Sequence, residues 1–239
     1  MSPRELFTLL GVGIENSLYN ARLNLREAAL LGRCAWWWRL KSGLNLSYLL
    51  DPPFMVCRRE LKASGLPQSD VTFGETPLLT AYRLLSELSV GPSDTVVDLG
   101  CGRGQTLLLA ALAFRARGVG LEVLPTFVGR ARWLAHSLAV EDQVSFEQRD
   151  FRSGPLPEGT LYFLSATCLE NESWRQVQST MVEAPAGARA LVVSSPLPRL
   201  CWETEWVRPV EYSWGVAQTY LQRRLGPPPL KSRKRRPRD

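Results

Sequence analysis

The sequence predicts an α/β fold: a mostly parallel seven-stranded sheet that ends in an antiparallel hairpin and follows an N-terminal helical extension. Between residues 95 and 194, short apolar runs alternate with helical patterns, which is typical of a parallel sheet that helices cover on both faces. Two alternating runs, 207–212 and 216–223, then flank the turn Ser213-Trp214-Gly215 and indicate the hairpin. Residues 17–41 are rich in Leu, Ala and Arg, which indicates helix.

The composition fits one globular domain with additions. The chain has 239 residues, 45% of them hydrophobic and 22% charged, so it can bury a full core. We expect a helical extension over 1–70, a ligand-binding domain over 71–224 and a disordered tail over 225–239. The tail contains six basic residues and one acid, so it carries most of the net charge of +6 of the chain. It is either a solvated end or a segment that attracts nucleic acid or another anionic partner.

Cysteine and histidine usage restricts the chemistry. The five cysteines are odd in number, widely spread and form no C-x-x-C pair, which indicates free thiols in a reducing compartment. We also expect no secretory signal, because the first residues lack its charged, apolar and cleavage regions. The protein is therefore expected to be cytoplasmic. His136 is the only histidine, so no metal centre is expected.

The extension reads as helix followed by a short second helix. Apolar residues recur at helical spacing over 17–41, and basic residues interrupt the pattern, so we expect no membrane-spanning helix. The three tryptophans at 36–38 are expected to pack the extension onto the main domain; the alternative is that they contact a membrane surface. A helix over 54–63 and a polar turn over 65–69 follow.

The main domain begins with a loop and a helix. Residues 71–77 lead into a helix over 78–88, with Thr76 as its expected N-cap. Such a loop can fold over a bound ligand; the alternative is a plain capped turn. The parallel strands are expected at 95–99, 118–122, 143–148, 161–164 and 190–194, and the helices between them at 105–114, 125–138 and 171–183.

A glycine-rich turn follows the first of these strands. The residues from Asp98 to Gln105 read Asp-Leu-Gly-Cys-Gly-Arg-Gly-Gln, with glycines at Gly100, Gly102 and Gly104. The glycines allow positive φ and a close approach to bare backbone, and the following helix start supplies unpaired N–H groups. Open α/β sheets bind ligands at this end of a strand. The turn therefore predicts a cofactor site, unless it is a glycine turn without a ligand.

The spacing of the glycines favours one cofactor. A dinucleotide fingerprint needs glycine at the first, third and sixth positions, but Gly104 falls one place early, where Gln105 takes the sixth position. The order Asp-x-Gly-x-Gly-x-Gly resembles motif I of the class I S-adenosylmethionine (SAM) methyltransferases. We therefore expect SAM as the cofactor, with a dinucleotide as the alternative.

Further cofactor-binding candidates end the neighbouring strands. Glu122 can accept hydrogen bonds from both ribose hydroxyls, as an acid after the second strand does in Rossmann folds. The alternative is that Glu122 is a surface acid. Asp150 can accept from the adenine amino group and Phe151 can lie on the adenine face, unless they are a turn acid and a core ring. Gln105 and Thr76 lie near the methionine end by position.

The end of the fourth strand is expected to face the methyl group. Methyl transfer from a sulfonium is an in-line displacement in which alignment and proximity dominate. Ser165 and Thr167 offer hydroxyls and carbonyls there, and no general base is obvious. The two are candidate catalytic residues, unless they form a structural strand end. Cys101 is interpreted as small packing.

A more specific resemblance covers residues 71–198. Phe73-Gly74-Glu75-Thr76, motif I with Gln105, Gly120-x-Glu122, Asp150-Phe151 and Val192-Val193-Ser194-Ser195-Pro196 follow one another as in the Dot-one type histone-lysine methyltransferases. The resemblance implies a Rossmann-like class I methyltransferase fold in which Glu75 and Thr76 lie over SAM, Gln105 holds its methionine end and Glu122 binds ribose. The stretch 120–125 and the hairpin also resemble the lysine methyltransferases of the ATP-synthase c-ring.

The resemblance implies methyl transfer to a protein lysine, and hence a protein partner. The chain departs from the Dot-one family at Ser165-Ala166, where that family has an Asn pair, and it lacks the usual N-terminal domain. It is also similar to uncharacterised bacterial methyltransferases through residues 167–170 and Trp214-Gly215. The alternatives are methylation of RNA or a small molecule, and a non-catalytic scaffold. No Asn/Asp-Pro-Pro-Tyr motif follows the fourth strand, which counts against nucleobase amines.

Overall fold

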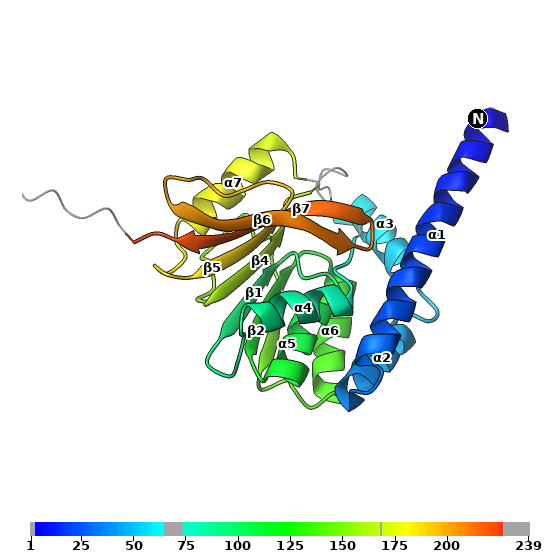
Figure 1. The fold of residues 1–239 in the computed structure, drawn as a ribbon, viewed down its shortest axis with the longest axis horizontal. Helices are drawn as coiled ribbons and strands as arrows, with labels where there is room; N and C mark the ends of the chain where they lie inside the picture. Colours follow the sequence, from blue (N-terminus) through cyan, green and yellow to red (C-terminus); the bar gives the residue numbers. More distant parts are fainter. Residues whose placement is uncertain (1–2, 65–73, 168, 227–239) are drawn as a thin grey trace, which may run out of the picture.

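The computed structural model describes residues 3–64, 74–167 and 169–226, and it confirms the predicted architecture. One seven-stranded sheet has the order β3-β2-β1-β4-β5-β7-β6 and is flanked by helices (Figure 1). Strands β1 to β5 run parallel, whereas β7 pairs antiparallel with both β5 and β6. The strands are β1 (Thr95–Leu99), β2 (Arg117–Glu122), β3 (Val144–Gln148), β4 (Leu161–Ser165), β5 (Arg189–Val193), β6 (Trp202–Tyr212) and β7 (Gly215–Arg224).

Helices cover both faces of this sheet. The larger core cluster joins β1 to α2, α4, α5 and α6, and the smaller one joins the opposite face of the sheet to α7. The central strand β1 is buried except at its first residue, and residues 105–111 of α5 are all buried, which explains why both read as continuous apolar runs. The helices are α1 (Pro3–Leu31), α2 (Ala35–Ser47), α3 (Pro53–Ser64), α4 (Leu78–Glu87), α5 (Gln105–Phe114), α6 (Pro125–Ser137) and α7 (Asn171–Met181).

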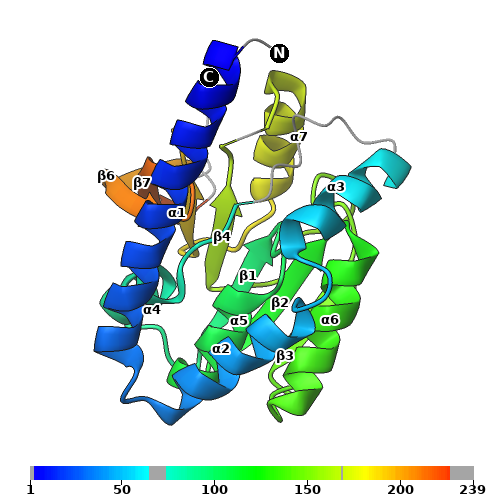
Figure 2. The ribbon, with the colours of Figure 1, turned by 90° about the vertical axis from the view of Figure 1, so that its right-hand side faces the viewer.

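The N-terminal segment departs from the prediction at one point. The expected single helix over 17–41 is two helices, because the chain turns between Leu31 and Ala35. A Cβ at Gly32 would lie 2.3 Å from the carbonyl oxygen of Ala28, so only glycine fits this turn. As a result the two helices diverge from the turn, so that α1 contacts α4 whereas α2 contacts α5 and α6 (Figure 2).

The extension packs on the domain through one buried carboxylate and two of the tryptophans. Glu27 is buried and accepts hydrogen bonds from Trp37 Nε1 at 3.0 Å and Lys41 Nζ at 2.9 Å. Trp36 stacks on Tyr82 of α4, with 5.8 Å between the ring centroids. Trp37 is buried as well, while Trp38 is exposed. The tryptophans therefore serve mainly in packing, as expected.

Two smaller predictions were wrong. Thr76 does not cap α4, because Pro77 takes the N-cap position and no side chain bonds the helix start. The hairpin is longer than expected, since β6 already begins at the buried Trp202 and a bulge between Thr204 and Trp206 hides its alternation in the sequence.

Some expectations lie outside the described residues. These are the turn over 65–69, the loop residues 71–73 and the basic run of the tail after residue 226. Among the residues that the structure describes, no helix is both long and apolar enough to cross a membrane. The boundaries at 70 and 224 and the cytoplasmic location stay predictions.

Candidate active site

The glycine turn after β1 has the expected conformation. Gly100, Gly102 and Gly104 have φ of 84°, 52° and 74°, the left-handed region that favours glycine. A Cβ at Gly104 would lie 2.5 Å from the ring of Phe146, so this position also needs glycine for space. At Gly102 an added Cβ would meet nothing within 4 Å, so its backbone is open to a ligand.

A cleft of about 300 Å³ lies at the carboxyl ends of β1, β2 and β4. Every predicted cofactor-binding residue lines it except Gly104, which instead supports the turn from behind. Both catalytic candidates line it as well. The predicted residues in the wall are Glu75, Thr76, Asp98, Gly100, Gly102, Gln105, Glu122, Asp150, Phe151, Ser165 and Thr167.

Two buried carboxylates face this cleft. Burial, with the Glu122 carboxylate adding to it, raises the pKa of Asp98 to about 8. Burial also raises the pKa of Glu122, although three backbone N–H groups oppose this by donating to its oxygens. These donors are Gly102 at 2.9 Å, Val123 at 2.8 Å and Leu124 at 3.0 Å. No described ion pair involves Asp98 or Glu122, so a positively charged ligand in this cleft would stabilise their ionised forms.

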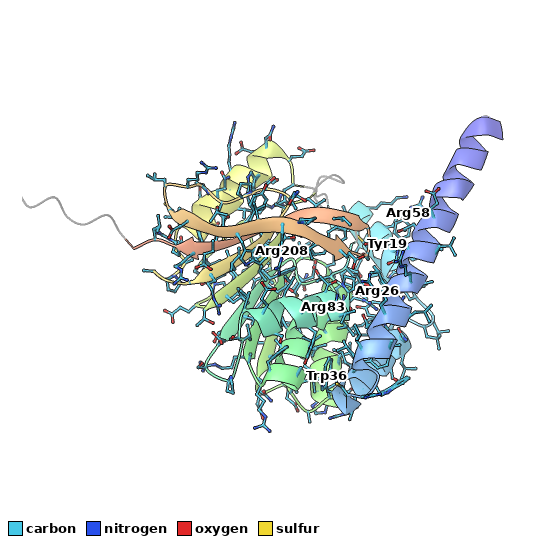
Figure 3. All side chains as sticks on the ribbon, viewed as in Figure 1. Tyr19, Arg26, Trp36, Arg58, Arg83 and Arg208 are labelled. Atoms are coloured by element: carbon cyan, nitrogen blue, oxygen red, sulfur yellow. The ribbon has the colours of Figure 1, made fainter. Side chains whose placement is uncertain are left out.

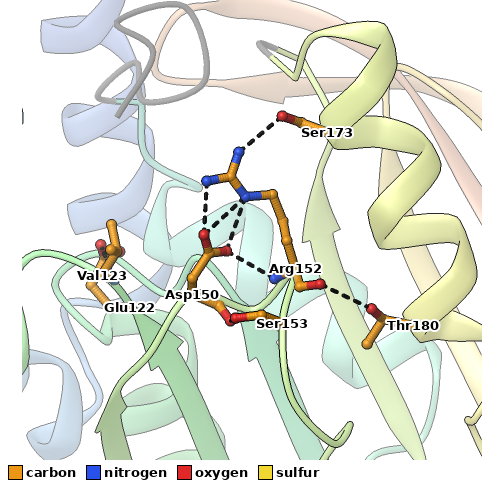
Figure 4. A network of polar contacts seen from close by, with 7 residues as sticks. All are labelled: Glu122, Val123, Asp150, Arg152, Ser153, Ser173 and Thr180. Carbon is orange, nitrogen blue, oxygen red and sulfur yellow. Dashed lines mark hydrogen bonds and ion pairs between the residues drawn. The ribbon is translucent and has the colours of Figure 1, made fainter. Parts of the chain in front are cut away.

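Asp150 is held by a residue that the sequence analysis missed (Figure 4). Arg152 donates to its carboxylate from the backbone N–H at 2.9 Å and from Nη2 at 2.7 Å. Burial alone would raise the pKa of Asp150, but the bonds from Arg152 outweigh it and keep the pKa below its usual value. The guanidinium also donates to Ser173 Oγ at 2.9 Å. An adenine amino group therefore has to share this carboxylate with Arg152.

The segment before α4 covers the cleft. Glu75 forms an ion pair with Arg103, with 2.7 Å between Oε2 and Nη2, and Gln105 Nε2 donates to the Thr76 carbonyl at 2.7 Å. The Glu75 backbone N–H donates to Ser213 Oγ at 2.8 Å and its carbonyl accepts from Ser213 N at 3.0 Å. We call these contacts the roof. Gln105 thus holds the roof here, and its role at the methionine end stays a prediction.

Side chains that the sequence analysis did not assign complete the site. Tyr48, at the end of α2, is buried and places its ring 5.2 Å below the guanidinium of Arg103. Trp214, at the hairpin tip, fills the space beside Gly74, where a Cβ would lie 2.5 Å from its ring. Trp214 also stacks on Tyr212, with 4.7 Å between ring centroids.

The acceptor end of the cleft is lined by hydroxyls and apolar groups. Thr167 Oγ1 lies 3.3 Å from Ser165 Oγ and 2.9 Å from Ser194 Oγ. Leu169 and Trp214 complete this end. Burial raises the pKa of the Cys101 thiol, in agreement with a packing role. The described part of the chain contains no cluster of three side chains suited to a metal ion.

Comparison with known proteins identifies the class. Residues 96–186 match the family model described as "Methyltransferase domain". A geranyl diphosphate 2-C-methyltransferase of Streptomyces lasalocidi is 30% identical over 131 residues, which is 52% of this chain and 40% of that protein. An ajmaline N-methyltransferase of Rauvolfia serpentina is 29% identical over 102 residues, 41% of this chain and 35% of that protein. The chain thus spans less than half the length of these curated relatives.

A solved structure supports the same class. An RNA methyltransferase of Salinibacter ruber, in complex with S-adenosyl-L-homocysteine, is 26% identical, covers 65% of this chain and 96% of its own, and has a TM-score of 0.55. These relatives act on small molecules or RNA and are not Dot-one type enzymes. The methyltransferase class is therefore confirmed, whereas the resemblance to the Dot-one family is not. The chain contains a class I, SAM-dependent methyltransferase domain.

Proposed function

We propose that this protein transfers the methyl group of SAM to a small-molecule acceptor. The observation that carries the proposal is a single covered cleft with acids at one end and an apolar, hydroxyl-lined wall at the other. The curated relatives named above, which methylate small molecules by their names, support this reading. RNA and protein lysine are the competing acceptors.

The cofactor end can hold SAM with the residues in place. When bound, SAM supplies a methyl group activated by its sulfonium. Ionised Asp98 can pair with a cationic group of the cofactor. Glu122 already accepts three N–H bonds, and because a carboxylate offers about four acceptor positions, it can still accept a ribose hydroxyl. The open backbone at Gly102 leaves room for this approach.

The acceptor end suits a nucleophile that needs no strong base. The hydroxyls of Ser165 and Thr167 can orient an acceptor by hydrogen bonds, and Leu169 and Trp214 can contact its apolar parts. The roof keeps water from the reacting atoms and holds the acceptor in line with the methyl group. We therefore expect an acceptor whose lone pair is free at neutral pH, such as a neutral amine or an electron-rich carbon.

RNA is a second candidate acceptor because of one specific relative. The Salinibacter enzyme is an RNA methyltransferase and matches over nearly its whole length. The six basic residues of the tail can attract a phosphate backbone. Against this stands the absence of an Asn/Asp-Pro-Pro-Tyr motif after β4.

Labelled SAM separates these acceptors. The full chain is incubated with an extract and methyl-labelled SAM, and the extract is divided into small-molecule, RNA and protein fractions. Label in the small-molecule fraction is expected. Label in RNA would assign RNA as the acceptor. Label in protein as methyl-lysine would assign protein lysine, the acceptor that the Dot-one resemblance implies.

Two variants provide the control. Asp98→Asn removes a carboxyl of the cleft that can ionise, whereas Asp142→Asn changes an exposed acid that does not line the cleft. Labelling should disappear with the first and persist with the second. Equal labelling by both would mean that this cleft is not the site of transfer.

A further inference from the structure

An exposed apolar corner joins α2 to α3. Five large apolar side chains within ten residues are at least half exposed: Leu46 at 64%, Leu49 at 70%, Leu50 at 95%, Phe54 at 60% and Met55 at 50%. We call this set the apolar corner. The segment from the end of α2 to the start of α3, which carries these residues, lies toward the viewer in Figure 2. A soluble surface rarely concentrates such side chains without a partner.

The charges around the apolar corner are basic. Phe54, Arg58 and Lys62 are spaced by four residues and exposed, so they share one face of α3. Figure 3 shows Arg58 on the same side of the molecule as α1. This helix therefore presents an apolar start and a basic end on one outward face.

The acids of the same segment are bound by neighbouring groups. Asp51 accepts hydrogen bonds from Arg59 at 3.0 Å and from Arg130 Nη2 at 2.9 Å. Glu60 accepts from the backbone N–H of Thr126 at 3.2 Å. The outward charge of the corner is thus positive, although the segment contains both signs.

We propose that the apolar corner docks on an anionic lipid bilayer. Exposed apolar side chains with flanking cations are the features of interfacial helices, whose apolar groups enter the bilayer while their cations contact lipid phosphates. A second copy of this chain fits less well, because a two-fold contact would set this face, whose outward charges are basic, against an identical basic face. Contact is peripheral, since no described helix could span the bilayer.

The corner is adjacent to the cofactor cleft. The inner face of α3 is buried, and its Cys57 lines the cleft. One helix diameter, about 10 Å, therefore separates the cleft wall from the docking face. Membrane contact was the alternative role for the tryptophans at 36–38, and the proposal assigns it to residues that follow them in the chain.

Vesicle binding by two matched variants tests the proposal. Leu50→Glu places a charge in the apolar corner, and Leu200→Glu places the same charge at a side chain 90% exposed in the connection before β6, the opposite edge strand from β3. The full-length proteins are sedimented with vesicles of phosphatidylglycerol and phosphatidylcholine, and with vesicles of phosphatidylcholine alone. Both variants keep the basic tail, so a difference in binding between them comes from the substituted position.

The wild-type protein and Leu200→Glu should bind the anionic vesicles and bind the neutral ones more weakly. Leu50→Glu should bind the anionic vesicles about tenfold less tightly or worse, because burial of a leucine is lost. SAM titration calorimetry on both variants checks that each is folded. The proposal is overturned if the wild-type protein does not bind, if both variants bind equally, or if Leu50→Glu only dissolves a dimer.

Discussion

Asp98 is the residue whose change should affect stability and function in opposite directions. Its carboxyl is buried beside Glu122, and its pKa is raised to about 8. The folded state therefore holds a proton on Asp98 at pH values where the unfolded chain has released it. This proton stabilises the fold fully below the pKa of an unfolded Asp, near 4, and the stabilisation is lost as the pH rises through about 8.

The size of the effect follows from the two pKa values. One pKa unit corresponds to about 1.4 kcal/mol, so the contribution of Asp98 falls by about 3.5 kcal/mol between pH 5 and pH 8. Asn cannot titrate and has nearly the same shape. Asp98→Asn should therefore remove this fall and make the cofactor-free protein more stable than the wild type at pH 8, while it abolishes SAM binding.

Urea unfolding at pH 5 and pH 8 measures the difference. Wild type, Asp98→Asn and the exposed control Asp142→Asn are compared at both pH values, and calorimetry follows SAM binding. The control should show the same pH dependence as the wild type. A pH dependence in Asp98→Asn that equals that of the wild type would refute the buried, protonated carboxyl.

Three further predictions concern the cleft. Gly104→Ala should destabilise the fold by about 1–3 kcal/mol in thermal or urea unfolding, because the added Cβ meets the Phe146 ring at a positive φ; unchanged stability would contradict this. Trp214→Ala should raise the KM for the acceptor, since the indole lines the acceptor end, and should leave the affinity for SAM measured by calorimetry within about twofold. A loss of SAM affinity would assign Trp214 to the cofactor instead. Arg103→Lys should weaken SAM binding about tenfold, because the bidentate pair with Glu75 and the contact with an aromatic ring are lost; equal affinity would show that the ion pair does not order the site.

The fold and the cofactor end of the site could be predicted because their signals are local. The glycine turn needs positive φ at three neighbouring residues, and Glu122 is placed by the strand that it ends. The turn at Gly32 was missed because the helical pattern of the sequence continues across it, and the need for glycine, whose missing Cβ leaves room for the Ala28 carbonyl, is visible only in the folded chain.

The contacts of the roof, of Trp214 and of Arg152 could not be predicted, because no local pattern in the sequence indicates them. Glu75 and Ser213 are 138 residues apart in sequence, and nothing near either residue indicates the other. Gly74 is part of the motif Phe73-Gly74-Glu75-Thr76, but the motif does not show why glycine is needed there. Glycine is needed because the Trp214 ring occupies the space that a side chain would take. Arg152 follows Asp150 by two residues, and its hold on that acid appears only in three dimensions.

The roof has a consequence for the rate of the reaction. The cleft is closed at one place by four contacts. They are the ion pair between Glu75 and Arg103, the hydrogen bond from the Gln105 side chain, and two hydrogen bonds between Glu75 and Ser213 at the hairpin tip. Release of a spent cofactor past the roof would require several of these bonds to break together. We therefore expect exchange of S-adenosylhomocysteine for fresh cofactor, and not the transfer step, to limit steady-state turnover.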